Sequence, residues 1–291
     1  VFAEEIIRMD QPKIEKMIQP SQGVHIVLER RFLKSKHAIL IPQTSDGRVL
    51  FAVPWKNYVV VGTTDTQVKK ASEEPKALKE EVNFILKNAG KYMSVKPKKD
   101  DIKSVFAGLR PLAATSNKQS TKEVSRSHKI DISPSGLISV LGGKWTTYRK
   151  IAEDAINTAI SINKLKKKKC KTERTKLFGF KRNVSWSDPM HVYGSLKKKV
   201  ESLGGINDNK SLSNKFYISN NIIEWSIIHE MALTVEDILA RRTRCVFLDS
   251  KESKRIAPIV AQKMADVLGE DDKWIDAELK KFNKLIKNYI V

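Results

Sequence analysis

The chain has 291 residues, of which 41% are hydrophobic and 30% are charged, so its composition is that of a soluble globular protein. Its formal net charge is +21, from 54 lysines and arginines against 33 acidic residues. No apolar run approaches the ~20 residues that span a bilayer, and the first residues show neither a signal peptide nor an Arg-rich presequence. Because the sequence starts at Val1 rather than Met, we expect it to begin inside a longer protein.

The basic excess favours an anionic partner. The candidates are nucleic acid, an anionic membrane surface and a phosphorylated substrate. The densest basic run, residues 164–171, holds no aromatic side chain on which a base would stack, so we interpret it as a solvated linker and predict no nucleic-acid binding. Two cysteines far apart, Cys170 and Cys245, are typical of a reducing, cytoplasmic setting. No grouping of His, Cys and Asp has zinc-like spacing, so no metal site is predicted.

The first half begins with strand signals. Alternating apolar residues predict a strand over 24–28 with one buried face. Asp46-Gly47 lies between the apolar runs 38–41 and 49–53, and this pattern predicts a hairpin because glycine takes the positive φ of a tight turn. A further strand over 58–63 extends the hairpin into a three-stranded antiparallel meander.

A helix is predicted to open at Glu73-Glu74-Pro75, since acids and proline suit a helix start. Strands are then expected over 104–109, 129–133 and 137–141. A helix beginning near Thr146 carries an apolar stripe along one side. The first half therefore reads as α+β with a largely antiparallel sheet.

After the lysine-rich run the periodicity becomes helical, over 222–233, 256–268 and 274–289. Thr234-Val-Glu-Asp237 is a capping box in its acidic variant. The predicted fold class is thus α+β, with a largely antiparallel sheet domain followed by a small all-α C-terminal domain. The expected segments are 1–20 as a connector, 21–165 as the α+β domain, 166–175 as a basic linker and 176–291 as the all-α domain.

The most informative stretch, residues 141–152, runs from a strand through a diglycine into a helix. Such a junction exposes backbone N–H groups at a helix N-terminus, here with Lys144 beside them. Fixed N–H dipoles and an ammonium would stabilise the negative charge that a flavin gathers when it accepts a hydride. The alternative is that the glycines only permit close packing of strand and helix.

Two arginines, Arg110 and Arg126, stand at the ends of predicted strands. A guanidinium binds phosphate oxygens through two parallel hydrogen bonds, so both arginines together with Lys144 would suit a phosphate dianion. Taken singly, each arginine is more often a surface ion pair. His25 alternates with apolar neighbours and could take an alcohol proton, although a hydrogen-bonded structural histidine fits the residues better. The other four histidines show no such pattern.

The segment Gly142-Gly-Lys-Trp-Thr-Thr-Tyr-Arg-Lys-Ile-Ala152 resembles the second signature of FAD-dependent glycerol-3-phosphate dehydrogenases, G-G-K-x-x-T-Y-R-x-x-A, at every specified position. Further segments along the chain are similar to the family: Gly23–Val27, Pro54–Trp55, Val61–Asp65, Phe106–Leu112, Val124–Arg126, Thr234–Arg244 and Phe247–Asp249.

The resemblance implies a flavoenzyme that oxidises sn-glycerol 3-phosphate to dihydroxyacetone phosphate by hydride transfer to FAD and passes electrons to quinone. It implies that His25 and Arg110 are catalytic, and that Arg110, Arg126 and Lys144 bind the substrate phosphate. It assigns flavin contacts to Gly142, Gly143, Lys144, Trp145, Thr146 and Thr147. It also implies a cytoplasmic protein, peripheral to the inner face of an anionic membrane, and is compatible with a homodimer.

The family's Gly-x-Gly-x-x-Gly turn, which cradles the dinucleotide pyrophosphate, does not occur in this sequence. We therefore expect residues 1–20 to be the remnant of a missing N-terminal FAD-binding segment. We also expect these 291 residues alone to bind FAD weakly and to turn over no substrate. Two alternatives stay open: an oxidase that hands electrons to O2, and a non-catalytic basic module that binds nucleic acid or a membrane.

Overall fold

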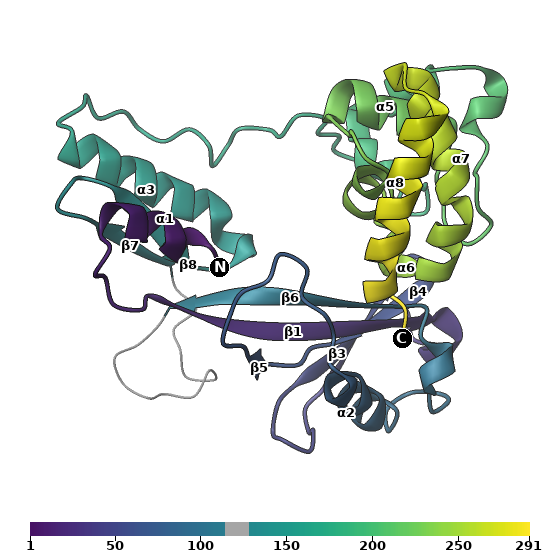
Figure 1. Cartoon of the computed structure of the whole chain (residues 1–291), viewed down its shortest axis with the longest axis horizontal. Coiled ribbons are helices and arrows are strands. Elements are labelled where there is room, and N and C mark those ends of the chain that lie inside the picture. The colour runs from purple at the N-terminus through teal and green to yellow at the C-terminus, as the bar shows by residue number, and fades with distance from the viewer. Residues whose placement is uncertain (114–127) are drawn as a thin grey trace. The chain divides into compact units, whose positions relative to one another are not determined.

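The computed structural model describes residues 1–113 and 128–291 (Figure 1). The chain divides into two compact units, each assembled from separate stretches of sequence. The first unit consists of Val1–Gly23, Thr64–Pro75 and Ala107–Lys176, and the second of Val24–Thr63, Lys76–Phe106 and Leu177–Val291. The predicted division into successive domains stays a prediction.

The main sheet has six strands in the order β2-β3-β4-β1-β5, with β6 also paired to β1. The strands are β1 (Ile18–Glu29), β2 (Ile39–Ile41), β3 (Leu50–Trp55), β4 (Tyr58–Gly62), β5 (Thr66–Gln67) and β6 (Ser104–Ala113). β2, β3, β4 and β1 pair successively in antiparallel fashion. The predicted antiparallel meander and the α+β class are confirmed.

The hairpin between β2 and β3 turns at Gly47, as predicted. Gly47 has φ 75°, which glycine adopts without steric cost. Its N–H donates to the Thr44 carbonyl at 3.1 Å, and the Thr44 hydroxyl donates to Asp46 at 2.8 Å. The turn is therefore specified by its own residues.

In the first unit, helix α1 (Ala3–Asp10) packs near a separate hairpin of β7 (His128–Ile132) and β8 (Ile138–Gly142). Ile7, Ile18 and Leu141 form its small core. The Glu4 carboxylate accepts hydrogen bonds from the backbone N–H groups of Met17 and Ile18, both at 3.0 Å, which ties α1 to the start of β1.

The helix after the diglycine, α3 (Tyr148–Ile162), begins two residues later than predicted. A single 3-10 turn over Trp145–Thr147 precedes it, because the Thr147 N–H donates to the Lys144 carbonyl at 3.0 Å. The predicted apolar stripe is not fully buried within the described parts of the chain, and Ile156 is 61% exposed.

The second unit contains the remaining helices: α2 (Lys79–Ala89), α4 (Lys197–Glu201), α5 (Asn220–Glu230), α6 (Cys245–Leu248), α7 (Ser250–Leu268) and α8 (Asp272–Leu285). The prediction that α2 opens at Glu73-Glu74-Pro75 is wrong. The Leu78 N–H donates to the buried Glu81 carboxylate at 2.9 Å, and this local cap starts the helix at Lys79.

The predicted capping box at residues 234–237 is confirmed. The Asp237 N–H donates to the Thr234 hydroxyl oxygen at 3.1 Å, and the Thr234 N–H donates to the Asp237 carboxylate at 3.0 Å. The element that it opens is a short π-helical turn, Asp237–Arg242. Among the helices that the structure describes, none combines the length and the apolar character needed to cross a membrane.

Helices and strands of the second unit share one hydrophobic core. Val27 of β1 and Tyr58 of β4 pack in the same buried cluster as Leu239 and Phe282. Backbone contacts reinforce this packing, since the Val105 N–H donates to the Tyr289 carbonyl at 3.0 Å. The buried Ser104 hydroxyl donates to the Val246 carbonyl at 2.8 Å. The C-terminal helices are thus integral to this part of the sheet.

Candidate functional site

A pocket of about 380 Å³ lies in the first unit, where the end of β6 meets the turn that follows β8. Its lining residues are Leu109, Arg110, Pro111, Leu112, Gly142, Gly143, Lys144 and Trp145. The structure therefore brings two of the predicted phosphate-binding cations, Arg110 and Lys144, to one pocket. Arg126, the third, lies outside the described residues.

Arg110 is held by the turn that precedes β5. Its Nη1 donates to the Thr64 carbonyl at 3.2 Å and lies 3.7 Å from Asp65 Oδ1. Gly23 of β1 faces the guanidinium so closely that a methyl group there would lie 2.7 Å from Arg110 Cζ. A glycine at position 23 thus allows the Arg110 side chain to lie against the strand. The sequence pattern gave Gly23 no role beyond the resemblance.

Replacing Gly23 with Ala should force the Arg110 guanidinium to move. If Arg110 binds phosphate as predicted, the affinity of the intact protein for inorganic phosphate should fall about tenfold, because hydrogen bonds to a charged group contribute roughly 1.5–3 kcal/mol. Isothermal titration measures this affinity. Gly108→Ala is the matched control, since a methyl group at Gly108 of β6 meets open space. An equal loss in both variants would contradict the contact.

The diglycine turn requires glycine at both positions. Gly142 has φ 69° and Gly143 has φ 87°, a region that other residues enter at a cost of roughly 1–2 kcal/mol. A methyl group at Gly143 would also lie 2.6 Å from Ile151 Cδ1 of α3 and 3.2 Å from His128 Cβ. Close packing of strand and helix is therefore realised at Gly143, while its contact with a flavin stays a prediction.

The helix start beyond the diglycine presents unused hydrogen-bond donors. Among the residues that the structure describes, no acceptor is found for the N–H groups of Trp145 and Thr146. Lys144 is exposed, and the Trp145 side chain is 86% exposed and stacks on Tyr148 with ring centroids 5.5 Å apart. Donors, an ammonium and an uncovered ring at one turn fit a planar ligand with anionic or carbonyl oxygens.

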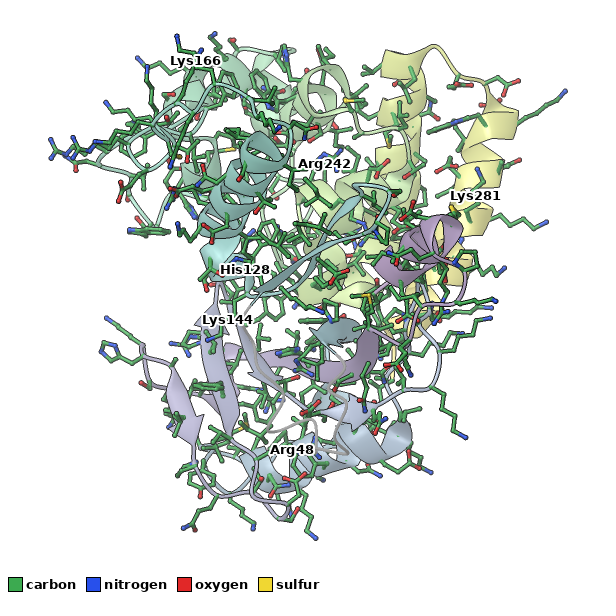
Figure 2. The ribbon with its side chains drawn as sticks, turned by 90° about the vertical axis from the view of Figure 1, so that its left-hand side faces the viewer. Arg48, His128, Lys144, Lys166, Arg242 and Lys281 are labelled. Atoms are coloured by element: carbon green, nitrogen blue, oxygen red, sulfur yellow. The ribbon has the colours of Figure 1, made fainter. Side chains whose placement is uncertain are left out.

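His128, which the sequence pattern did not single out, lies next to the diglycine turn. It lies opposite Gly142 in the β7–β8 pairing, and Figure 2 labels it together with Lys144. The His128 Nε2 atom lies 3.2 Å from Asp154 Oδ2 of α3. The other oxygen of this carboxylate, Oδ1, forms an ion pair with Lys150 Nζ at 2.9 Å. The hydrogen bond from Lys150 lowers the pKa of Asp154, so the carboxylate is charged. If the predicted strands 129–133 and 137–141 are paired as a hairpin, His128 falls opposite Gly142, and this register could have identified it from the sequence.

His25 belongs to the second unit, on β1 opposite Gly62. Its ring stacks on Phe106 with centroids 5.1 Å apart, and a methyl group at Gly62 would lie 2.8 Å from His25 Cγ. The ring is therefore clamped between a glycine and a phenylalanine. This packing is sufficient to explain a histidine at position 25 on structural grounds. The role of His25 as a base stays a prediction.

Residues 1–149 match the family of FAD dependent oxidoreductases, and residues 138–275 match the C-terminal domain of alpha-glycerophosphate oxidase. The first match covers more than half of the chain. The chain therefore belongs to the FAD-dependent oxidoreductase family.

Within that family the chain is similar to glycerol-3-phosphate dehydrogenases. It is 32% identical over 311 residues to the mitochondrial enzymes of Mesocricetus auratus and Bos taurus, covering 98% of this chain and 42% of each relative. The probable mitochondrial enzyme of Dictyostelium discoideum is 33% identical over 315 residues, covering 99% of this chain and 49% of the relative. The chain thus spans less than half the length of these curated relatives.

A solved structure has the same fold. The glycerol-3-phosphate dehydrogenase from Bacillus halodurans, complexed with FAD, superposes with a TM-score of 0.81 at 24% sequence identity. The superposition covers 100% of this chain and 61% of that chain.

Proposed function

We propose that this chain provides the substrate pocket of an FAD-dependent enzyme that oxidises sn-glycerol 3-phosphate to dihydroxyacetone phosphate. The observation that carries the proposal is the pocket where Arg110 and Lys144 meet beside the diglycine turn. Membership of the FAD-dependent oxidoreductase family and the similarity to glycerol-3-phosphate dehydrogenases support it.

Arg110 and Lys144 bind the substrate phosphate in this proposal. The planar guanidinium of Arg110 engages two phosphate oxygens, and Lys144 adds a compact positive charge. The Thr64 carbonyl and Asp65 hold Arg110 in place at 3.2 and 3.7 Å. Asp65 neutralises only one of the two cations, so Arg110, Lys144 and Asp65 together keep the net positive charge that a dianion requires.

The diglycine turn and the helix start bind the flavin. The N–H groups of Trp145 and Thr146 and the Lys144 ammonium donate to its carbonyl oxygens, and these fixed donors need no reorganisation during the reaction. Bound FAD supplies the hydride acceptor for C2 of the substrate. His25 takes the proton from the C2 hydroxyl, a role that suits an imidazole near neutral pH.

The intact protein that contains this chain, purified with FAD, should have a flavin absorption band that sn-glycerol 3-phosphate bleaches under anaerobic conditions. Glycerol should not bleach it at the same concentration, because it lacks the phosphate that Arg110 and Lys144 hold. Equal bleaching by both compounds would contradict the phosphate pocket. No bleaching by glycerol 3-phosphate would contradict the proposed activity itself.

Quinone is the electron acceptor that we propose first. The match of residues 138–275 to the C-terminal domain of an oxidase favours O2 as a second candidate. Rapid mixing of the reduced protein with a soluble quinone or with air decides between them. Fast reoxidation by air with one peroxide per flavin would replace quinone with O2.

Location and assembly also belong to the proposal. A formal net charge of +21 supports peripheral attachment to an anionic membrane at its cytoplasmic face. Sedimentation of the intact protein with anionic vesicles, reversed by salt, tests the attachment. Light scattering tests the proposed homodimer.

A further inference from the structure

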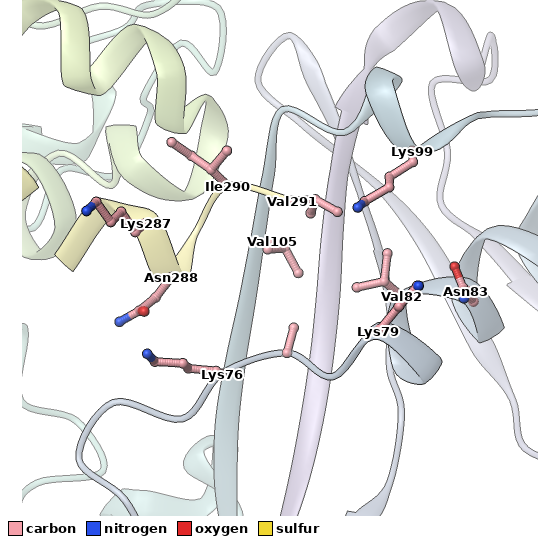
Figure 3. A pocket seen from close by; sticks show the side chains of 11 residues that line it. Lys76, Lys79, Val82, Asn83, Lys99, Val105, Lys287, Asn288, Ile290 and Val291 are labelled. Atoms are coloured by element: carbon pink, nitrogen blue, oxygen red, sulfur yellow. The ribbon is translucent and has the colours of Figure 1, made fainter. Parts of the chain in front are cut away.

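The second unit contains a pocket of about 390 Å³ that the proposed reaction does not use (Figure 3). It lies between helix α2, the 3-10 turn Lys99–Asp101, the start of β6 and the C-terminal residues. Four lining residues are lysines: Lys76, Lys79, Lys99 and Lys287. None of the residues described as lining the pocket has an acidic side chain.

The floor of this pocket is apolar. Val82 of α2 is 5% exposed and Val105 of β6 is 3% exposed. Ala77 and Ile290 extend the apolar surface. Figure 3 shows Val105 near the centre, with Lys76 and Lys287 on one side and Val82, Lys79 and Lys99 on the other. An apolar body on this floor would leave water while its charged groups reach the lysines.

Three of the lysines that line the pocket have no acidic partner among the described residues. Within the described parts of the chain, the ammonium groups of Lys79, Lys99 and Lys287 form no ion pair. By contrast, Lys263 and Lys281 each pair with a glutamate at 2.8 Å. Lys79 is also the first residue of α2, where the helix dipole adds positive potential. An anion in the pocket could pair with these ammonium groups.

We propose that this pocket binds a free, monomeric anionic amphiphile. Its apolar body rests on Val82 and Val105, and its phosphate or carboxylate groups lie among the lysines. The side-chain amides of Asn83 and Asn288, which also line the pocket, hydrogen-bond its polar groups. The inference does not depend on the proposed oxidation, because all of its residues lie in the second unit.

Fluorescence titration of the intact protein with 8-anilinonaphthalene-1-sulfonate, an apolar anion, tests the lysines. A variant that combines Lys79→Ala, Lys99→Ala and Lys287→Ala should bind the probe at least about tenfold more weakly than the wild type. Their side chains are exposed, so the thermal midpoint should change little. Binding equal to that of the wild type would overturn the proposal.

The matched control combines Lys199→Ala, Lys254→Ala and Lys273→Ala, three exposed lysines of the same unit that do not line the pocket. It makes the same change in net charge. Binding by this variant should stay within about twofold of the wild type. An equal loss in both triple variants would mean that the probe follows overall charge, which refutes a defined site.

The apolar floor is tested without changing any charge. Ala77→Phe should fill the pocket and abolish probe binding. Octyl phosphate, below its critical micelle concentration, should displace the probe at concentrations at least about tenfold lower than inorganic phosphate. Equal potency of the two anions would rule out an amphiphile. Displacement only by vesicles of phosphatidylglycerol and phosphatidylcholine would rule out a free ligand.

Discussion

Replacing Arg110 with Ala is expected to lower kcat/KM for glycerol 3-phosphate about 100-fold or more in the intact protein. The guanidinium donates two charge-assisted hydrogen bonds to the phosphate in our proposal, and each contributes roughly 1.5–3 kcal/mol. Together they correspond to about two to four orders of magnitude. Steady-state kinetics with a dye acceptor measures the effect.

Two variants sharpen this test. Arg110→Lys should recover only part of the loss, because an ammonium cannot reproduce the planar pair of donors. Arg255→Ala is the matched control, since Arg255 pairs with Glu252 at 2.7 Å but lies in the second unit. It should change kcat/KM less than about twofold. Wild-type kinetics in Arg110→Ala would exclude this pocket as the phosphate site.

Replacing Phe282 with Ala should lower the free energy of unfolding by about 3–5 kcal/mol. Phe282 of α8 is 2% exposed and packs in the core that also contains Val27 of β1 and Tyr58 of β4. We therefore expect the strands to lose protection together with the helices. Denaturant titration measures the stability, and amide hydrogen exchange of β4 reports on the strands.

Phe178→Ala is the control for this stability loss. The Phe178 side chain is 90% exposed, so its removal should change the free energy of unfolding by no more than about 0.5 kcal/mol. If Phe282→Ala accelerates exchange in α8 while β4 keeps its full protection, helices and strands do not unfold as one unit.

Local patterns predicted those parts of the fold that local interactions determine. Asp46-Gly47 supplies its own turn geometry, and Thr234 and Asp237 cap each other directly. The start of α2 was predicted incorrectly because the acidic residue that caps the helix is Glu81, which accepts from the Leu78 N–H, and not Glu73 or Glu74. The shared core of helices and strands could not be predicted, since no periodicity indicates which apolar faces meet.

The sequence predicted some residues of the candidate site but not the contacts between them. The diglycine motif pointed to Lys144, and strand ends pointed to Arg110, which the structure brings to one pocket. The close approach of Gly23 to Arg110 joins residues that are distant in sequence, so only the fold reveals it. The roles of His25 and Arg126 stay predictions.

The second unit is assembled from separate stretches of the chain, which limits where the chain can be cut into expression fragments. An expression fragment that ends in the basic linker would retain β1 and β4 but lose every helix that covers Val27 and Tyr58. Its newly uncovered apolar surface would favour aggregation. A fragment of the helices alone would lack the Val105 N–H, which donates to the Tyr289 carbonyl. Either half would need the other to be co-expressed.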